Sequence, residues 1–144
     1  MPLAFSYPLM KRYTYWPQLF LGITFNWGII MAWVAMSNSI STEILIFYLS
    51  AIFWTLGYDT IYGLQDIQDD KIIGIKSTSI KFKNNVKVFV GVCYSLCVFF
   101  ILLLGFLMEI DKYSLLSSFF ILSLIYQIKY FKLSNPESCL TAFK

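Results

Sequence analysis

The sequence predicts an all-α integral membrane protein with about four membrane-spanning helices, and three observations support this fold class. Of the 144 residues, 58% are hydrophobic and only 13% are charged, whereas an ordinary soluble domain has about 25% charged residues. The apolar residues form long blocks without a charge, of which Leu19–Met36 and Val88–Met108 are the clearest. A bilayer core requires roughly 20 apolar residues per helix, and backbone groups in lipid must bond within their own helix.

Four helices are predicted at approximately residues 19–36, 44–62, 86–108 and 113–131. The last block is the shortest of the four. An acidic and then basic connection, residues 59–87, joins the second helix to the third. The first ten residues read as the end of a preceding helix, because they are apolar and a basic pair follows them.

The basic residues predict which helix ends share one side of the membrane. Ten of the eleven lie before the first helix, between the second and third helices, or after the fourth, and Lys112 is the exception. Short loops rich in Lys and Arg stay in the cytoplasm. Both termini and the 59–87 connection are therefore expected to face the cytoplasm, for a bacterial inner membrane, or the matrix, for a mitochondrial inner membrane. The two locations remain alternatives.

The other polar residues exclude some kinds of site. The sequence contains no histidine, so a histidine base and a histidine metal ligand are both excluded for this chain. Cys93 and Cys97 are spaced i, i+4 without a second pair that would give a metal-ligand spacing, and we interpret them as small apolar residues. Asn26, the one strongly polar side chain in the middle of the first helix, is expected either to line a cavity or to form an interhelical hydrogen bond.

Four of the eight acidic residues lie within twelve positions, where the second helix leaves the membrane. On a continuous helix, Asp66 and Asp70 are i, i+4 neighbours, and Asp59 lies two turns earlier on the same face. Asp69 lies one position off that face. Carboxylates stacked in this way repel one another, so a cation or a basic group is expected between them.

Two interpretations of these acids remain open. They form either the solvated end of a helix or a site for Mg²⁺, which binds one or two carboxylates together with phosphate oxygens. The second is favoured because an ionisable residue at membrane depth, such as Asp59, is costly and usually functional. Lys71 and Lys76 follow as partners for the remaining phosphate charge. Acid followed by base at a membrane surface suggests a magnesium-bridged phosphate ester of a lipid.

The segment that contains these acids resembles a known family. Tyr58–Thr78, with the sequence YDTIYGLQDIQDDKIIGIKST, is similar to the second aspartate-rich motif of the UbiA superfamily of intramembrane prenyltransferases, and most similar to its 4-hydroxybenzoate polyprenyltransferase branch. Tyr7–Thr14 resembles the basic loop before the fifth helix of that family, and Cys139–Lys144 resembles the lead-in to its last helix. The resemblance implies that residues 1–144 are one partial UbiA domain, matching roughly the fifth to the eighth helices of a nine-helix bundle.

The resemblance implies an enzyme that transfers a polyprenyl group from polyprenyl diphosphate to carbon 3 of 4-hydroxybenzoate in ubiquinone biosynthesis. It assigns the catalytic carboxylates to Asp66 and Asp70, which would hold Mg²⁺ against the diphosphate, with Asp69 and Asp59 as supporting ligands. Neutralising the charge on the leaving diphosphate lets the allylic carbon ionise. The implied partners are the two substrates and the lipid bilayer, and no nucleic acid is expected.

Four further residues are candidates for substrate binding. The resemblance places Lys11 or Arg12 near the aromatic carboxylate or the diphosphate. We assign Arg12 to the carboxylate because a planar guanidinium suits that group, and the alternative for this pair is a positive-inside membrane anchor. Lys76 is a charge partner for the diphosphate. Tyr62 either lines the pocket, where its ring would stabilise an allylic cation, or is an ordinary interfacial tyrosine.

The family uses two aspartate-rich motifs on opposite sides of one cavity, and this chain contains one of them. We therefore expect a C-terminal part of the enzyme, cut at both ends and inactive alone, which a separately encoded N-terminal half would complete. The alternative function is a non-catalytic membrane transport or assembly subunit with an acidic cation-binding surface. Transporters carry their ionisable residues near the membrane midplane, whereas these acids lie at one surface, which favours the enzyme.

Overall fold

The regular elements of the chain are α-helices throughout the part that the computed structural model describes, residues 9–109 and 113–130. The all-α prediction is confirmed for these residues. A short helical stretch at residues 9–13 precedes seven helices, which are α2 (Pro17–Phe25), α3 (Trp27–Ser37), α4 (Thr42–Tyr62), α5 (Ile67–Ile73), α6 (Thr78–Lys81), α7 (Val86–Leu107) and α8 (Tyr113–Tyr130).

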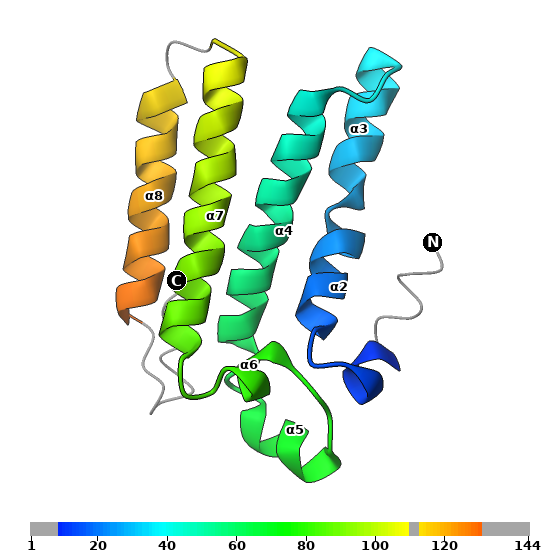
Figure 1. The fold of residues 1–144 in the computed structure, drawn as a ribbon, viewed down its shortest axis with the longest axis vertical. Coiled ribbons are helices and arrows are strands. Elements are labelled where there is room, and N and C mark those ends of the chain that lie inside the picture. Colours follow the sequence, from blue (N-terminus) through cyan, green and yellow to red (C-terminus); the bar gives the residue numbers. More distant parts are fainter. Residues whose placement is uncertain (1–8, 110–112, 131–144) are drawn as a thin grey trace.

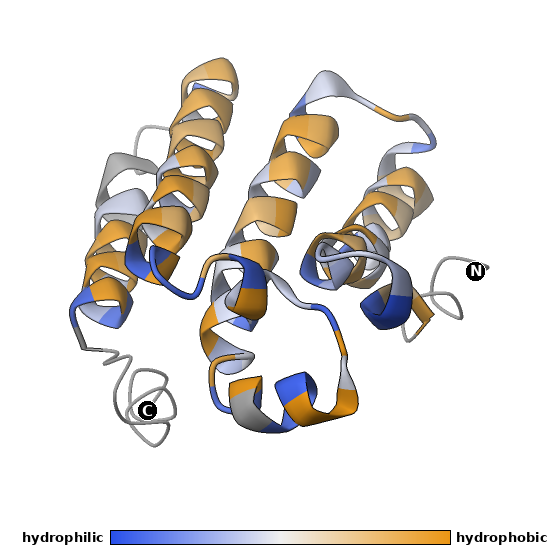
Figure 2. Cartoon of the chain, turned by 60° about the horizontal axis from the view of Figure 1, so that its bottom comes forward, coloured by the Kyte–Doolittle hydropathy of each residue, from blue (hydrophilic) through white to orange (hydrophobic). Residues whose placement is uncertain are grey.

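The long helices stand side by side in a row, and the short ones lie at one end of it (Figure 1). Helices α2 and α3 follow one another end to end and pack against α4, which packs against α7, which packs against α8. Neighbouring members of the row run in opposite directions. Helices α5 and α6 and the segment 9–16 all lie at the same end, where hydrophilic residues gather, whereas the helices of the row are mostly hydrophobic (Figure 2).

Within residues 9–109 and 113–130, three helical segments are long and apolar enough to cross a membrane: Pro17–Ser37, which combines α2 and α3, then Thr42–Tyr62 and Val86–Leu107. They identify the chain as an integral membrane protein. Of the four predicted spans, the last is not confirmed at full length. Within α8 the described apolar part is Ser117–Lys129, which is shorter than the roughly 20 residues that a bilayer core requires.

The first membrane span is interrupted at Asn26, which ends α2 and precedes α3. Its side-chain amide nitrogen donates to the carbonyl of Gly22 at 2.8 Å, while its backbone nitrogen lies 3.3 Å from the same oxygen. A side chain that enters the backbone hydrogen-bond ladder in this way bends or breaks a helix. The predicted continuous helix 19–36 is therefore two helices joined at one residue.

The same amide ties the break to α4. The Asn26 nitrogen also donates to the Thr55 hydroxyl at 2.8 Å and lies 3.3 Å from the carbonyl of Ala51. Close by, the Tyr48 hydroxyl donates to the carbonyl of Ile23 at 2.6 Å. Of the two roles predicted for Asn26, the structure shows the interhelical hydrogen bond, and the side chain is only 7% exposed.

Helices α4, α7 and α8 share the main apolar core. Its buried members are Ile61, Leu64, Val86, Val90, Tyr94 and Leu124. Polar contacts join the same helices: the Tyr94 hydroxyl donates to Gln127 at 2.8 Å, and the Ser50 hydroxyl lies 3.1 Å from the carbonyl of Cys97. Cys93 and Cys97 are both buried and unbridged, consistent with their interpretation as small apolar residues.

Candidate functional site

The second span ends within the acidic cluster, between Asp59 and Asp66. Helix α4 stops at Tyr62, and the backbone tightens there, because Leu64 and Gln65 donate to the carbonyls three residues earlier, at 3.1 and 3.2 Å. Helix α5 then starts afresh, with Asp66 as its N-cap. Asp59 therefore lies in a different helix from Asp66, and the two do not share one helical face.

Helix α5 carries the remaining acids of the cluster. The backbone nitrogen of Asp70 donates to the carbonyl of Asp66 at 2.8 Å, so these two residues lie one turn apart, as their spacing predicts. The Asp66 carboxylate makes no capping hydrogen bond. Asp66 and Asp69 are exposed, and Asp70 is half-buried. Their oxygens are thus open to an external cation.

A glycine determines where α5 ends. Gly74 has φ 79°, in the left-handed region that other residues enter only with strain. The nitrogens of Ile75 and Gly74 donate to the carbonyls of Asp70 at 2.9 Å and Lys71 at 3.3 Å, the paired bonds of a Schellman motif. This turn directs residues 75–78 back toward the bundle.

Lys11 is the basic residue that connects the acids of the two helices. It interacts electrostatically with both Asp59 in α4 and Asp70 in α5. Burial raises the pKa of Asp70, Lys11 opposes this rise, and Asp66 and Asp69 raise the pKa further. Asp70 therefore lies near both a cation and two other carboxylates, and an added cation would offset the effects of its burial and of these carboxylates.

The four predicted metal ligands do not form a protein-only metal site. Within residues 9–109 and 113–130, no three His, Cys, Asp or Glu side chains come close enough to hold one ion. Asp66 and Asp70 can still hold a metal ion that needs only two ligands from the protein. Magnesium commonly uses one or two carboxylates and takes its other ligands from water and substrate phosphates. The pair in α5 therefore fits Mg²⁺ that arrives with a phosphate ester.

Lys76 lies against the N-terminal basic segment. Its backbone nitrogen donates to the carbonyl of Lys11 at 2.8 Å, and its ammonium lies 3.4 Å from the carbonyl of Tyr13 and 5.5 Å from the centre of the Tyr15 ring. Arg12 is exposed in the same segment. The structure thus brings the two basic stretches together, although they are more than sixty residues apart.

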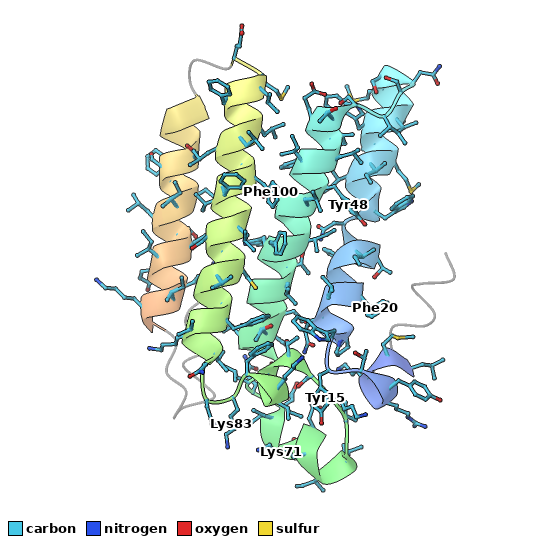
Figure 3. All side chains as sticks on the ribbon, viewed as in Figure 1. Tyr15, Phe20, Tyr48, Lys71, Lys83 and Phe100 are labelled. Atoms are coloured by element: carbon cyan, nitrogen blue, oxygen red, sulfur yellow. The ribbon has the colours of Figure 1, made fainter. Side chains whose placement is uncertain are left out.

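A second basic pair lies at this end of the bundle. Lys71 and Lys83 are both exposed, and the positive charge of Lys83 lowers the pKa of Lys71. Figure 3 shows both side chains near the end that also carries Tyr15, whereas Tyr48 and Phe100 lie farther along the row of helices. Lys71 therefore adds positive charge beside the acids of α5.

Aromatic rings pack the N-terminal segment against the connection between α6 and α7 and against the first turns of α7. The Trp16 ring makes edge contacts with Phe82 and Phe89, with centroids 5.8 and 6.1 Å apart. The Lys81 ammonium lies 4.5 Å above the same indole, a cation–π distance. Residues 11–16 therefore have a defined position relative to the acidic segment.

Tyr62 belongs to a column of stacked rings along α4. Trp54 stacks on Tyr58 with centroids 5.7 Å apart, and Tyr58 stacks on Tyr62 at 6.2 Å. Tyr62 is 42% exposed at the acidic end of the helix. Sequence reasoning singled out only Tyr62, although the i, i+4 spacing of the three aromatics was a visible signal.

Sequence reasoning also missed a group of buried polar residues behind the site: Gln18, Thr60, Ser77, Thr78 and Ser79. Three of them lie next to one another in the motif, directly after Lys76. The only signal in the sequence was this run of small hydroxyl residues, whose partners lie in two other helices.

Known proteins resemble this chain along its length. The model of the UbiA prenyltransferase family matches residues 1–144. The chain is 49% identical over 105 residues to a mitochondrial 4-hydroxybenzoate polyprenyltransferase of Arabidopsis thaliana. The matched region covers 72% of this chain and 26% of the relative. The chain is 38% identical over 145 residues to the protein of the same name from Dictyostelium discoideum, covering 99% of this chain and 31% of the relative.

A plant relative carries a different donor in its name. The chain is 41% identical over 140 residues to 4-hydroxybenzoate geranyltransferase 2 of Lithospermum erythrorhizon, covering 96% of this chain and 46% of the relative. The chain therefore spans about a quarter to a half of the length of these curated relatives. No solved structure matches it. Because the family model covers every residue, the chain belongs to the UbiA prenyltransferase family.

Proposed function

We propose that this chain forms part of a membrane enzyme that transfers a polyprenyl group from polyprenyl diphosphate to carbon 3 of 4-hydroxybenzoate, in ubiquinone biosynthesis. One observation carries the proposal: α5 presents Asp66 and Asp70 one turn apart, beside Lys11, at the end of a membrane span. The relatives support the acceptor, because their names share 4-hydroxybenzoate although their donors differ.

The diphosphate would bind at α5. Asp66 and Asp70 would hold Mg²⁺, which supplies positive charge to the leaving diphosphate. Lys11 adds a second positive charge at the same place. Lys76 would take up remaining phosphate charge by leaving the Tyr13 carbonyl, a contact of 3.4 Å that is long for a hydrogen bond. Asp69 and Asp59 serve as supporting carboxylates.

The reaction breaks the bond between the allylic carbon and the diphosphate oxygen, and the electron pair leaves with the diphosphate. The ring carbon ortho to the hydroxyl then bonds to the allylic carbon and loses its proton to the released diphosphate or to water. The exposed ring of Tyr62, stacked on Tyr58, offers an electron-rich face to the allylic cation. Arg12 is the candidate for the carboxylate of the acceptor, since its fork of donors suits that group.

The names of the relatives and the positions of the basic residues support a particular membrane and orientation for the chain. The relatives from Arabidopsis and Dictyostelium are named mitochondrial, which supports the mitochondrial inner membrane, and a bacterial inner membrane is the alternative. The basic residues beside α5 and α6 would face the matrix or the cytoplasm. The polyprenyl tail would then lie in the bilayer while its diphosphate reaches the polar end of the helices.

A reconstitution assay tests the proposal. Membranes that contain this chain alone should transfer no labelled prenyl group to 4-hydroxybenzoate, because one acidic cluster holds the diphosphate from one side only. Membranes that also contain the part of a relative that this chain does not span should show transfer that depends on Mg²⁺. Transfer by the chain alone would refute the one-sided site, and its absence from the combined membranes, with both parts present and folded, would refute the proposed enzyme. A transport or assembly subunit would give this second result.

A further inference from the structure

The segment that follows Lys76 is buried although it is polar. Ser77, Thr78 and Ser79 are only 1%, 0% and 0% exposed. Burying a hydroxyl or a backbone amide without a partner is costly, so the partners of these groups decide whether the segment can hold this position.

Thr78 is held from two helices at once. Its backbone nitrogen donates to the side-chain oxygen of Gln18 in α2 at 3.0 Å. Its hydroxyl lies 2.7 Å from the hydroxyl of Thr60 in α4, and the Thr60 hydroxyl is also 2.6 Å from the carbonyl of Leu56. Thr60 is 0% exposed and Gln18 is 4% exposed. Thr78 thus bonds both Gln18 and Thr60, and all three residues are removed from water.

Ser79 adds a second bond to the same residue of α4. At the tightened end of that helix, Leu64 donates to Ile61, and the carbonyl of Thr60 accepts instead from the Ser79 hydroxyl at 2.8 Å. This satisfies a carbonyl that a helix end would otherwise leave open. Gly63 makes room for the bond, because a Cβ atom there would lie 2.6 Å from the Ser79 oxygen.

These bonds hold the segment that follows the C-terminal end of α5. Only residues 74–77 separate α5 from Thr78, and within them the Lys76 nitrogen is bonded to the Lys11 carbonyl. We propose that Thr60 is a positioning residue for the phosphate site: its hydroxyl holds Thr78 and thereby keeps Asp70 beside Lys11. This inference rests on the proposed function, since Thr60 acts through Asp70 and not on the substrate.

A matched set of variants tests the role of Thr60. Thr60→Val keeps the shape and removes the hydroxyl, and Thr60→Ser restores it. Thr55→Val is the control, because Thr55 lies in the same helix and its buried hydroxyl also bonds a side chain outside that helix, that of Asn26 at 2.8 Å. Both valine variants therefore lose a buried hydroxyl that bonds one backbone carbonyl of α4 and one side chain outside that helix, but only Thr60→Val loses the bond to Thr78.

Two measurements on the full chain in nanodiscs separate positioning from stability. The first is amide hydrogen exchange over residues 72–80, which should be about fivefold faster in Thr60→Val, the effect of one lost buried hydrogen bond. The second is the affinity for Mn²⁺, followed by the spectrum of the free ion, which should be about tenfold weaker, as expected for removal of a group that orients a ligand. Thr60→Ser and Thr55→Val should match the parent chain in both.

The outcomes are distinguishable. Equal exchange in Thr60→Val and Thr55→Val would overturn the inferred attachment of the segment. Faster exchange with unchanged Mn²⁺ affinity would overturn the positioning role. A parent chain that binds no Mn²⁺ would overturn the proposed metal site, and the positioning role with it, while the exchange data would still decide whether Thr60 holds residues 74–78.

Discussion

The backbone of Gly57 in α4 lies directly against the ring of Tyr94 in α7. A Cβ atom at position 57 would be 2.5 Å from one ring carbon of Tyr94 and 2.8 Å from the next. The ring has little freedom to move away, because it is 2% exposed and its hydroxyl is bonded to Gln127 in α8. This contact sets how closely the two central helices approach and therefore how the row is assembled.

Gly57→Ala should therefore destabilise the protein. The added methyl group must displace a buried ring, and overpacking of this kind costs about 1–3 kcal/mol. The measurement is the thermal unfolding midpoint in detergent. Gly91→Ala in α7 is the control: a Cβ there meets nothing within 4 Å, and alanine is favoured over glycine in a helix by about 0.5–1 kcal/mol. A midpoint for Gly57→Ala equal to that of the control would contradict the close packing.

Asn26→Leu should weaken the contact between the first two spans. The variant loses the bonds of the amide to Thr55 and Gly22, and interhelical hydrogen bonds in membranes contribute about 0.6 kcal/mol on average, up to about 1.7. We expect a loss in that range by reversible unfolding in mixed micelles.

Ser95→Ala serves as the comparison for Asn26→Leu. The Ser95 hydroxyl is exposed and donates to the carbonyl of Gly91 within its own helix, so its removal should change little. An Asn26→Leu protein as stable as Ser95→Ala would show that the amide bond to α4 does not stabilise the fold.

Asp66→Ala and Asp70→Ala should each abolish prenyl transfer in the reconstituted system. Each removes a carboxylate from the pair that would hold Mg²⁺, and losing a group that stabilises transition-state charge typically costs about 100-fold or more. Initial rates at saturating Mg²⁺ measure this loss. Asp69→Ala, which removes a supporting carboxylate, should retain more activity than either. An active Asp70→Ala enzyme would refute the assignment of that carboxylate.

The end of the bundle that carries α5 should face the matrix or the cytoplasm. Ile72 in α5 is 84% exposed, and Met36 at the opposite end of the row is 91% exposed. The thiols of the variants Ile72→Cys and Met36→Cys should therefore both react with a maleimide. In sealed vesicles of known orientation, a membrane-impermeant maleimide should reach position 72 only from the side that corresponds to the cytoplasm or matrix. Position 36 should react only from the other side, and the reverse pattern would contradict the charge-based orientation.

The native cysteines set the background of this labelling experiment. Cys93 and Cys97 are buried within the bundle, so they should react slowly. Cys139 lies outside the described residues, and it is replaced by serine in both variants. Any labelling of the chain without an added cysteine measures the remaining background.

Local features of the sequence were enough to predict three apolar spans and the acidic motif. Long apolar blocks require helices in lipid wherever they occur, and the i, i+4 spacing of Asp66 and Asp70 holds within α5 because that spacing belongs to any helix. Helical spacing also aligned Asp59 with Asp66, but the two lie in different helices, and no local feature of the sequence indicated that the Thr60 carbonyl would accept from Ser79. The metal assignment itself stays a prediction.

The sequence by itself thus determined that this is a helical membrane protein of the UbiA family with an acidic, lysine-flanked segment at one end. Only the tertiary structure decided that Asn26 divides the first span, that Gly57 lies against Tyr94, and that Thr60 meets Thr78. The reason is physical. Hydropathy and helical periodicity act between near neighbours in the chain, whereas these contacts depend on how separate helices are aligned, which the packing of the whole row determines.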